Sequence, residues 1–272
     1  MPIIQAQPPL SPSPQVSPFG FHFRPVTATK LHFSRFEFKY LLPRDLRNQV
    51  EAELSHFVEL DPFVKAQEGQ KYLVRSLYWD DPDLTAFQDK NDGMMHRSKF
   101  RLRTYTFGAS DPTPRFLEIK GRYNNLVFKH RTPVDMGPEQ AELGGDELTR
   151  YISEHIEEGP MQSQFLFQTY RRQIRPYALI DYVRRPYISK FDPEFRLTFD
   201  EQLQATDTDR LFPKASERTR RVAAGFTVME LKFRRHVPSW FHRIIQSYEL
   251  RRRSFSKICE GTVVLGLGDD DS

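Results

Sequence analysis

The dominant pattern along the chain is an alternation of apolar and polar residues with a period of two, which is typical of half-buried β-strands. This pattern predicts strands over residues 33–42, 71–79, 97–107, 115–121, 126–134, 165–174, 177–183, 195–200 and 226–233. Apolar residues at helical spacing predict helices over 44–58, 139–157, 238–250 and 254–265, with a short helical turn at 82–89. Many strands and few, segregated helices indicate an α+β fold with a mainly antiparallel sheet.

A proline-rich stretch precedes this pattern. Residues 1–29 contain seven of the 20 prolines and one charged residue, Arg24. Such a composition buries too little apolar surface to offset the entropy lost on ordering, so we predict a disordered Pro/Ser-rich tail over residues 1–30. One folded domain is expected over residues 31–266, followed by an acidic frayed tail over residues 267–272.

Several predicted strands carry mainly basic residues on one face. Residues two apart on a strand share a face, so four bases line up over residues 97–103, with Phe100 and Leu102 behind them. The same rule gives further charged faces on other strands, formed by Arg35, Glu37 and Lys39, by Glu118 and Lys120, by Lys129 and Arg131, by Arg196, Thr198 and Asp200, and by Glu230 and Lys232.

These charged faces have two interpretations. Each could be the solvated side of an antiparallel sheet. Four like charges along one strand repel one another, however, and the basic face recurs on several strands. A sheet curled with these faces inward would enclose a basic lumen, and helices would cover its apolar outside. Because such a lumen needs an anion to offset its self-repulsion, the pattern predicts a phosphate-rich ligand.

Composition excludes several other classes of protein. The 40 Lys and Arg residues exceed the 36 Asp and Glu residues by only four, but residues 232–257 hold eight bases and one acid. In contrast, residues 139–158 hold seven acids and one base. The single cysteine, Cys259, excludes an intramolecular disulfide framework and a Cys-rich zinc site. There is no P-loop or Rossmann glycine motif. No apolar run is long enough to span a membrane and no signal peptide is evident, so we expect a cytoplasmic protein.

Seven short motifs occur in order along the predicted strands and the last predicted helix. They are Arg-Phe-Glu-Phe-Lys-Tyr (35–40), Val-Arg-Ser-Leu-Tyr-Trp-Asp-Asp-Pro-Asp-Leu (74–84), Lys-Phe-Arg-Leu-Arg-Thr-Tyr (99–105), Phe-Leu-Glu-Ile-Lys (116–120), Tyr-Arg-Arg (170–172), Met-Glu-Leu-Lys (229–232) and Phe-Ser-Lys (255–257). The set resembles the VTC domain, the polyphosphate-polymerase module of the vacuolar transporter chaperone complex. This family belongs to the CYTH-like triphosphate tunnel metalloenzymes, so the resemblance implies an antiparallel β-barrel with a charged lumen, flanked by helices.

The resemblance also implies roles for particular residues. It assigns catalysis to Arg101, Arg103, Lys120, Arg172 and Lys232, and a divalent metal, Mn²⁺ or Mg²⁺, to Glu230. Lys39 and Lys129 resemble further tunnel bases, and Ser256 and Lys257 resemble residues of a C-terminal helix that closes on the phosphate chain. The alternation adds Arg35, Lys99, Arg131 and Arg196 as expected phosphate-binding residues, and Asp200 as a lining residue.

The expected activity is the ATP-dependent synthesis of polyphosphate. Hydrolytic and cyclase relatives open with Glu-x-Glu-x-Lys, whereas this chain has Arg-x-Glu-x-Lys with Arg35 first. The exchange weakens a two-metal hydrolase site and favours phosphate binding. A triphosphatase or cyclase on the same fold and a non-catalytic polyphosphate-binding module are the alternatives. ATP and polyphosphate are the expected partners, together with a membrane protein that brings the chain to the inner face of a membrane; no nucleic-acid partner is expected.

Overall fold

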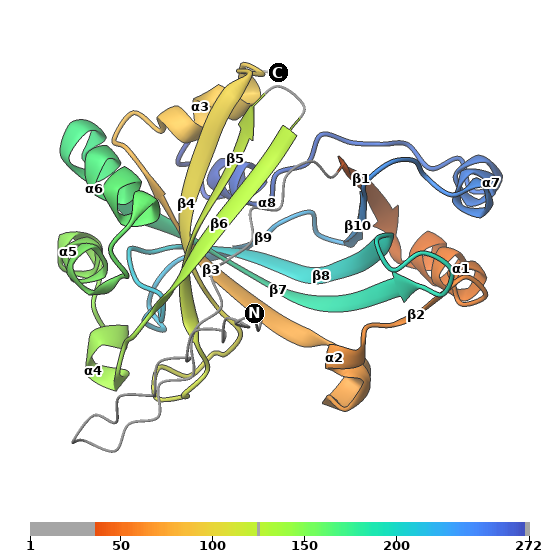
Figure 1. The fold of residues 1–272 in the computed structure, drawn as a ribbon, viewed down its shortest axis with the longest axis horizontal. Helices are drawn as coiled ribbons and strands as arrows, with labels where there is room; N and C mark the ends of the chain where they lie inside the picture. The colour runs from red at the N-terminus through yellow and green to blue at the C-terminus, as the bar shows by residue number, and fades with distance from the viewer. Residues whose placement is uncertain (1–35, 124–125, 270–272) are drawn as a thin grey trace, which may run out of the picture. The chain divides into compact units, whose positions relative to one another are not determined.

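A ten-stranded antiparallel sheet organises the described part of the chain, residues 36–123 and 126–269, in this computed structural model (Figure 1). Its strands are β1 (Phe36–Pro43), β2 (Val58–Leu60), β3 (Tyr72–Asp80), β4 (His96–Thr104), β5 (Arg115–Tyr123), β6 (Leu126–Val134), β7 (Arg175–Ser189), β8 (Arg196–Asp207), β9 (Thr219–Arg221) and β10 (Phe226–Phe233). The main strands are ordered β1-β10-β8-β7-β3-β4-β5-β6, and β2 and β9 pair with β7 and β8.

Eight α-helices and one 3₁₀ turn connect these strands within the described residues. They are α1 (Arg44–Leu54), α2 (Pro62–Lys65), the 3₁₀ turn η1 (Glu68–Gln70), α3 (Thr85–Asn91), α4 (Pro138–Ala141), α5 (Gly145–His155), α6 (Pro160–Arg172), α7 (Ser239–Ser247) and α8 (Lys257–Val264). No helix among these residues is both long enough and apolar enough to cross a bilayer.

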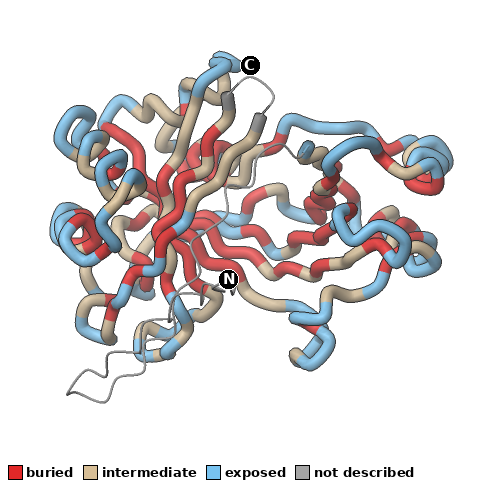
Figure 2. The backbone as a smooth tube through the Cα atoms, in the orientation of Figure 1, coloured by how far each residue is buried: buried red, intermediate tan, exposed pale blue. Residues whose placement is uncertain are grey.

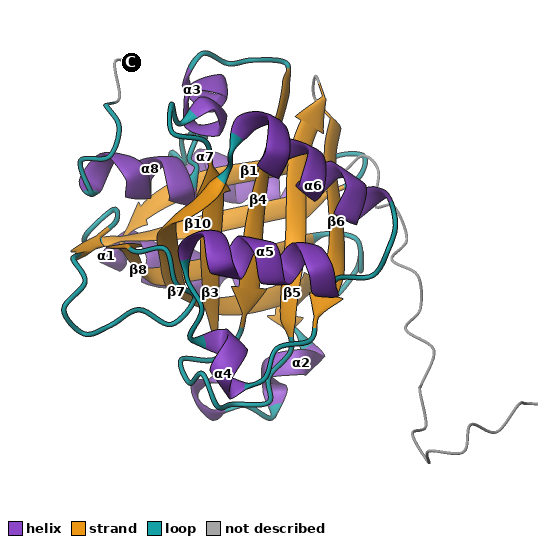
Figure 3. Ribbon diagram, turned by 90° about the vertical axis from the view of Figure 1, so that its left-hand side faces the viewer, coloured by secondary structure: helices purple, strands orange, loops and turns teal. Residues whose placement is uncertain are grey.

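The apolar face of the sheet, here called the outer face, is covered by helices. Leu102 and Leu117 of β4 and β5 pack against Leu148 of α5 and Phe165 of α6, and Figure 3 shows these two helices crossing the strands. At the other end of the sheet, β8 and β10 pack through a second apolar cluster against α1 and α7, to which α7 contributes Phe241. Because alternate residues point to opposite faces, burying these side chains turns the charged residues of the same strands to the inner face.

The helix α8 is different because it packs on the inner face. Ile180 of β7 and Ala205 of β8 pack with Ile258 and Cys259 of α8 in a third apolar cluster. The helix approaches closely at Gly261, where an added Cβ would lie 2.5 Å from Cδ1 of Ile180. Most residues of the central strands are therefore buried, because helices cover the sheet on both faces (Figure 2).

The sheet has an open seam between its two edge strands. Within the described residues, β1 and β6 are at opposite ends of the strand order and do not pair. The free edge of β1 is partly occupied by the segment before α8, where Tyr40 forms a bridge with Arg252 and the Arg253 amide donates to the Lys39 carbonyl over 2.9 Å. The predicted α+β fold, with an antiparallel sheet flanked by helices, is confirmed, but among residues 36–123 and 126–269 hydrogen bonds do not close the sheet into a barrel.

One predicted strand is a helix. Residues 165–174 alternate like a strand, but residues 160–172 form α6. Pro160 lies in its first turn, where the missing N–H is not needed, and Arg171 and Arg172 lie in its last turn, where they favour the helix dipole. The burial of Phe165 against β3–β5 then stabilises the helical conformation of this segment. The expected tail over residues 1–30 and the last three residues of the expected acidic tail lie outside the described residues.

Candidate functional site

The inner face collects a dense group of ionised side chains, which we call the basic cluster. It contains nine bases and four carboxylates: Lys39, Lys99, Arg101, Arg103, Lys120, Lys129, Arg184, Lys232 and Lys257, with Glu37, Glu118, Asp200 and Glu230. When all nine bases are protonated, five positive charges are in excess over the negative ones. Such an excess in a largely buried place attracts polyanions strongly.

Glu118 on β5 is the centre of the first part of the basic cluster. This carboxylate is fully buried. Its Oε2 atom lies 2.6 Å from Nη2 of Arg101 and 3.7 Å from Nη1 of Arg103, and its Oε1 atom lies 2.5 Å from Nζ of Lys129. Arg101 also donates to the Tyr78 hydroxyl over 3.0 Å. The bases come from β4 and β6, which pair with β5 on either side.

Asp200 and Glu230 form the second part. Asp200 is fully buried and accepts two hydrogen bonds from Arg184, over 2.6 and 2.8 Å, and it lies 2.6 Å from Nζ of Lys257. Glu230 lies 2.9 Å from Nζ of Lys232 and 3.6 Å from Nζ of Lys257. Lys257 on α8 therefore joins carboxylates from two neighbouring strands, and this ties the helix to the sheet.

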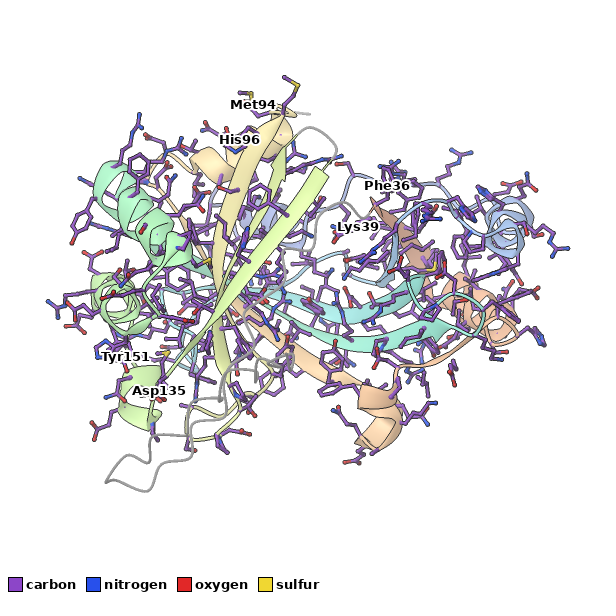
Figure 4. The ribbon with its side chains drawn as sticks, in the orientation of Figure 1. Phe36, Lys39, Met94, His96, Asp135 and Tyr151 are labelled. Atoms are coloured by element: carbon purple, nitrogen blue, oxygen red, sulfur yellow. The ribbon has the colours of Figure 1, made fainter. Side chains whose placement is uncertain are left out.

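The third part lies on β1, at the seam. Lys39, labelled in Figure 4, faces Glu230 in the register of β1 and β10 and donates to the Phe255 carbonyl over 2.7 Å. Glu37 lies two residues earlier on the same face, and its Oε2 atom is 2.8 Å from Nζ of Lys120 on β5. This ion pair joins the two sides of the seam where the backbone does not.

Burial and mutual attraction shift the pKa values in opposite directions. Burial lowers the pKa of Lys129 to about 7 and that of Lys39 to about 8, although Glu118 and Glu230 respectively act to raise them. Burial acts to raise the pKa of Glu230, but Lys232 and other nearby bases outweigh it and hold that pKa well below its usual range. Nearby bases also lower the pKa values of Glu37, Glu118 and Asp200, so the four carboxylates stay ionised at neutral pH, while the two lysines titrate close to it.

The first turn of α8 brings further groups to the site. Ser256 is the residue before the helix, and its hydroxyl makes no capping hydrogen bond. Nζ of Lys257 lies 4.8 Å from the centre of the Tyr182 ring, and the guanidinium of Arg184 lies 5.2 Å from the same centre. Lys99 of β4 contacts the Cys259 sulfur over 2.8 Å. These contacts hold the helix terminus beside the bases of the sheet.

The structure brings together most of the residues predicted from the sequence. Within the basic cluster or beside it lie Lys39, Lys99, Arg101, Arg103, Lys120, Lys129, Asp200, Glu230, Lys232, Ser256 and Lys257. Arg131 and Arg196 are exposed on the inner-face side of their strands, and Arg131 stacks on Phe116 at 4.3 Å. Arg35 lies outside the described residues.

Arg172 is not brought to the basic cluster. It is exposed in the last turn of α6, in the layer of helices that covers the outer face. The basic cluster contains another arginine, Arg184 on β7, which was not among the residues predicted from the sequence. The predicted strand 177–183 stops one residue short of Arg184, although the face shared by Ala178, Ile180 and Tyr182 continues to it.

The carboxylates of the basic cluster are the oxygen donors that a divalent cation would find at this site. In the described ranges, no group of three or more His, Cys, Asp or Glu side chains is arranged to hold a metal ion. Glu230 nevertheless supplies oxygen donors, and two ammonium groups already lie within 3.6 Å of it. Mg²⁺ and similar hard cations bind through one or two carboxylates when phosphate oxygens complete their shell. Glu230 could therefore contribute one carboxylate to such a cation, if phosphate oxygens or water supplied the rest of its shell.

Comparison with solved structures finds distant likenesses. A candidate adenylate cyclase of Bacillus halodurans is 12% identical and has a TM-score of 0.47, with 82% of this chain and 95% of that chain covered. A protein of Pyrococcus horikoshii is 10% identical over 86% of this chain and 99% of its own, with a TM-score of 0.43. The Mimivirus capping-enzyme triphosphatase is 6% identical over 79% and 89% of the two chains, with a TM-score of 0.32. These likenesses do not bear on function.

Comparison at the level of sequence is more informative. No curated protein sequence matches the chain. The VTC domain, in contrast, matches residues 34–265, which is most of the sequence and includes every residue of the basic cluster. The chain therefore belongs to the VTC domain family, and this membership supports a function in polyphosphate or triphosphate chemistry.

Proposed function

We propose that the protein is an ATP-dependent polyphosphate polymerase, which transfers the γ-phosphoryl group of ATP to the end of a polyphosphate chain. The observation that carries this proposal is the basic cluster, in which nine bases from β1, β4–β7, β10 and α8 converge on one inner face. Phosphoryl transfer depends mainly on positioning and charge neutralisation, which such a surface supplies.

The two kinds of base have different uses. The guanidinium groups of Arg101 and Arg184 are held in fixed planes by carboxylates that occupy their Nε and Nη2 donors, and their remaining N–H groups are available to phosphate oxygens. Lys39 and Lys232 offer compact charges on flexible stems, which can follow a phosphate chain as it moves. Together they could hold the triphosphate of ATP beside the end of an acceptor chain.

The acceptor explains why the site needs no strong general base. The terminal phosphate of a polyphosphate chain is already ionised, so its oxygen can attack the γ-phosphorus without losing a proton first. A new P–O bond then forms at the γ-phosphorus, the bond from that phosphorus to the β–γ bridging oxygen breaks, and ADP leaves. The bases neutralise the charge that gathers on the leaving diphosphate.

A divalent cation fits this scheme at Glu230. Glu230 would hold the cation, which would supply electrostatic stabilisation of the charge that develops on the phosphates. Lys232 and Lys257, which contact Glu230 in the structure, would then turn toward phosphate. Asp200, held by two hydrogen bonds from Arg184, lies close enough to share Lys257 and to orient it.

The proposal is tested by the products formed from ATP. Purified protein is incubated with ATP and Mn²⁺, and the products are separated by gel electrophoresis and ³¹P NMR. Long-chain polyphosphate and ADP are the expected products, and Glu230→Gln should abolish synthesis while leaving polyanion binding in place. Inorganic phosphate with ADP would indicate a triphosphatase instead, and binding without any turnover would indicate a non-catalytic module.

A further inference from the structure

Glu118 is surrounded by three of the bases that the proposed function needs for phosphate. Its carboxylate is completely excluded from solvent, and Arg101, Arg103 and Lys129 all lie within 3.7 Å of it. Arg103 also donates to the Ser76 hydroxyl over 3.1 Å. No other carboxylate of the basic cluster contacts both a pair of guanidinium groups and an ammonium group in this way.

A carboxylate in this position both helps and opposes the binding of phosphate. It helps because three buried bases without a counter-ion would repel one another and move apart. It opposes because a carboxylate and a phosphate offer these bases the same kind of oxygen acceptor. The ionised state needed for this role is secure, since the surrounding bases outweigh the effect of burial and hold the pKa of Glu118 far below its usual range.

We propose that Glu118 is a positioning residue that acts as a built-in counter-ion, holding Arg101, Arg103 and Lys129 in the geometry of phosphate recognition and competing with the phosphate chain for them. The role in synthesis rests on the proposed function, whereas the binding and unfolding measurements that test the proposal do not require polymerase activity. Glu118 itself touches no reacting atom.

The competition has a purpose in a polymerase. A product chain must shift by one phosphate after every transfer, so its sites must bind well enough to hold it and weakly enough to let it advance. Bases without Glu118 would grip each phosphate harder and slow this movement. Glu118 thus lowers the affinity for the phosphate chain and allows faster turnover. Removing its charge should therefore tighten the binding of the chain and slow its synthesis.

The first measurement is the equilibrium binding of tripolyphosphate to the free protein, without nucleotide or metal, at pH 5. At this pH Lys129, whose pKa is lowered by burial to about 7 against the opposing effect of Glu118, should stay protonated in the variant as well. Glu118→Gln keeps the shape of the side chain and removes the charge, and we expect roughly tenfold tighter binding. Glu194→Gln is the matched control, because Glu194 pairs with Arg234 on the surface and is half exposed. Its affinity should stay at the wild-type value.

The second measurement is thermal unfolding with and without tripolyphosphate. Glu118→Gln should lower the melting temperature of the free protein, because three bases lose their counter-ion, and tripolyphosphate should raise it by more than it raises that of the wild type. Glu118→Asp keeps the charge on a shorter stem, so it should bind tripolyphosphate within about twofold of wild type while losing synthesis rate through the lost geometry.

Three results would overturn the proposal. One is unchanged or weaker binding of tripolyphosphate by Glu118→Gln. Another is a Glu118→Gln protein that stays unfolded even with tripolyphosphate present, since a polyanion should replace the missing counter-ion. The third is a Glu118→Asp protein with wild-type synthesis. If the wild type binds tripolyphosphate but makes no polyphosphate, the polymerase assignment fails. The tripolyphosphate-binding and unfolding measurements still decide whether Glu118 acts as a counter-ion.

Discussion

Glu37 on β1 and Lys120 on β5 form an ion pair of 2.8 Å across a seam that no backbone hydrogen bond closes in the described residues. The pair is unequal in exposure, since the Lys120 side chain is 35% exposed and that of Glu37 only 11%. The inner face is therefore completed at this point by side-chain electrostatics. A seam held in this way should respond to pH and to salt more than the hydrogen-bonded parts of the sheet.

The first prediction concerns acid stability. Burial acts to raise the pKa of Glu37, but Lys120 and other bases lower it from 4.5 to about 2. Because the folded-state pKa is below the unfolded value, the stabilisation is complete above pH 4.5 and is lost as the pH falls toward 2. Urea unfolding at pH 7 should show that Glu37→Gln costs about 1–2 kcal/mol, and at pH 3 the cost should be smaller.

An equal cost of Glu37→Gln at both pH values would show that the ion pair does not stabilise the seam. Glu59→Gln serves as the control, because Glu59 pairs with Lys65 over 3.0 Å and both side chains are about half exposed. A surface pair of this kind contributes little to stability, so its loss should leave unfolding nearly unchanged at either pH.

The second prediction concerns the protonation of Lys39. Burial lowers its pKa to about 8, so a fraction of the free protein carries a neutral amine at this position at pH 8. A bound phosphate favours the ammonium form, and binding must then take up protons. Calorimetry of tripolyphosphate binding at pH 8, in two buffers of different ionisation enthalpy, should show this uptake, and the affinity should fall as the pH rises through 8.

Lys39→Met should remove the proton uptake near pH 8 and weaken binding. The uptake that remains should centre near pH 7, where burial places the pKa of Lys129. If the Lys39→Met protein still takes up the same number of protons at pH 8, then Lys39 does not face the phosphate.

The third prediction compares two arginines that the sequence and the structure place differently. Arg184 donates twice to Asp200 inside the basic cluster, whereas Arg172 is exposed on α6. Arg184→Lys cannot reproduce the bidentate contact, so we expect at least about tenfold weaker tripolyphosphate binding. Arg172→Ala should bind as the wild type does. The reverse order of effects would mean that α6 contributes to the phosphate site in solution.

Much of the site was accessible from the sequence because strands have a strict period. Alternation alone placed Arg101 and Lys129 on one side of their strands, and the structure puts both beside Glu118. The bounds of β6 were also predicted, since this strand spans the expected residues 126–134. An alternation of period two is a property of neighbouring residues, so it can be recognised in the sequence without knowing which distant segments are in contact.

The rest depends on contacts between distant segments. Residues 165–174 alternate like a strand, and only the packing of α6 on the outer face shows that they form a helix. The ion pair of Glu37 with Lys120 joins residues that are 83 positions apart, so no local pattern reveals it. Glu118 was visible as a charged residue beside Lys120, but its three partners become evident only when β4 and β6 flank β5.

The fourth prediction concerns the contact that positions α8. A Cβ at Gly261 would lie 2.5 Å from Cδ1 of Ile180 and 3.1 Å from Cβ of Ala205, so Gly261→Ala must push the helix away from the sheet. Alanine favours a helix by up to about 1 kcal/mol over glycine, but overpacking costs about 1–3 kcal/mol. We therefore expect a net loss of stability, together with weaker tripolyphosphate binding, because the same helix carries Lys257 to Asp200.

A double-mutant cycle separates this steric effect from any other. Ile180→Val removes the methyl group that the new Cβ would meet, and alone it should cost about 0.5–1.5 kcal/mol. In the Ile180→Val, Gly261→Ala protein the two changes should compensate by about 1 kcal/mol, and tripolyphosphate affinity should return toward the wild-type value. Additive losses would show that α8 is not seated on Ile180. A restored affinity would show that the position of Lys257 is set by how closely α8 approaches β7.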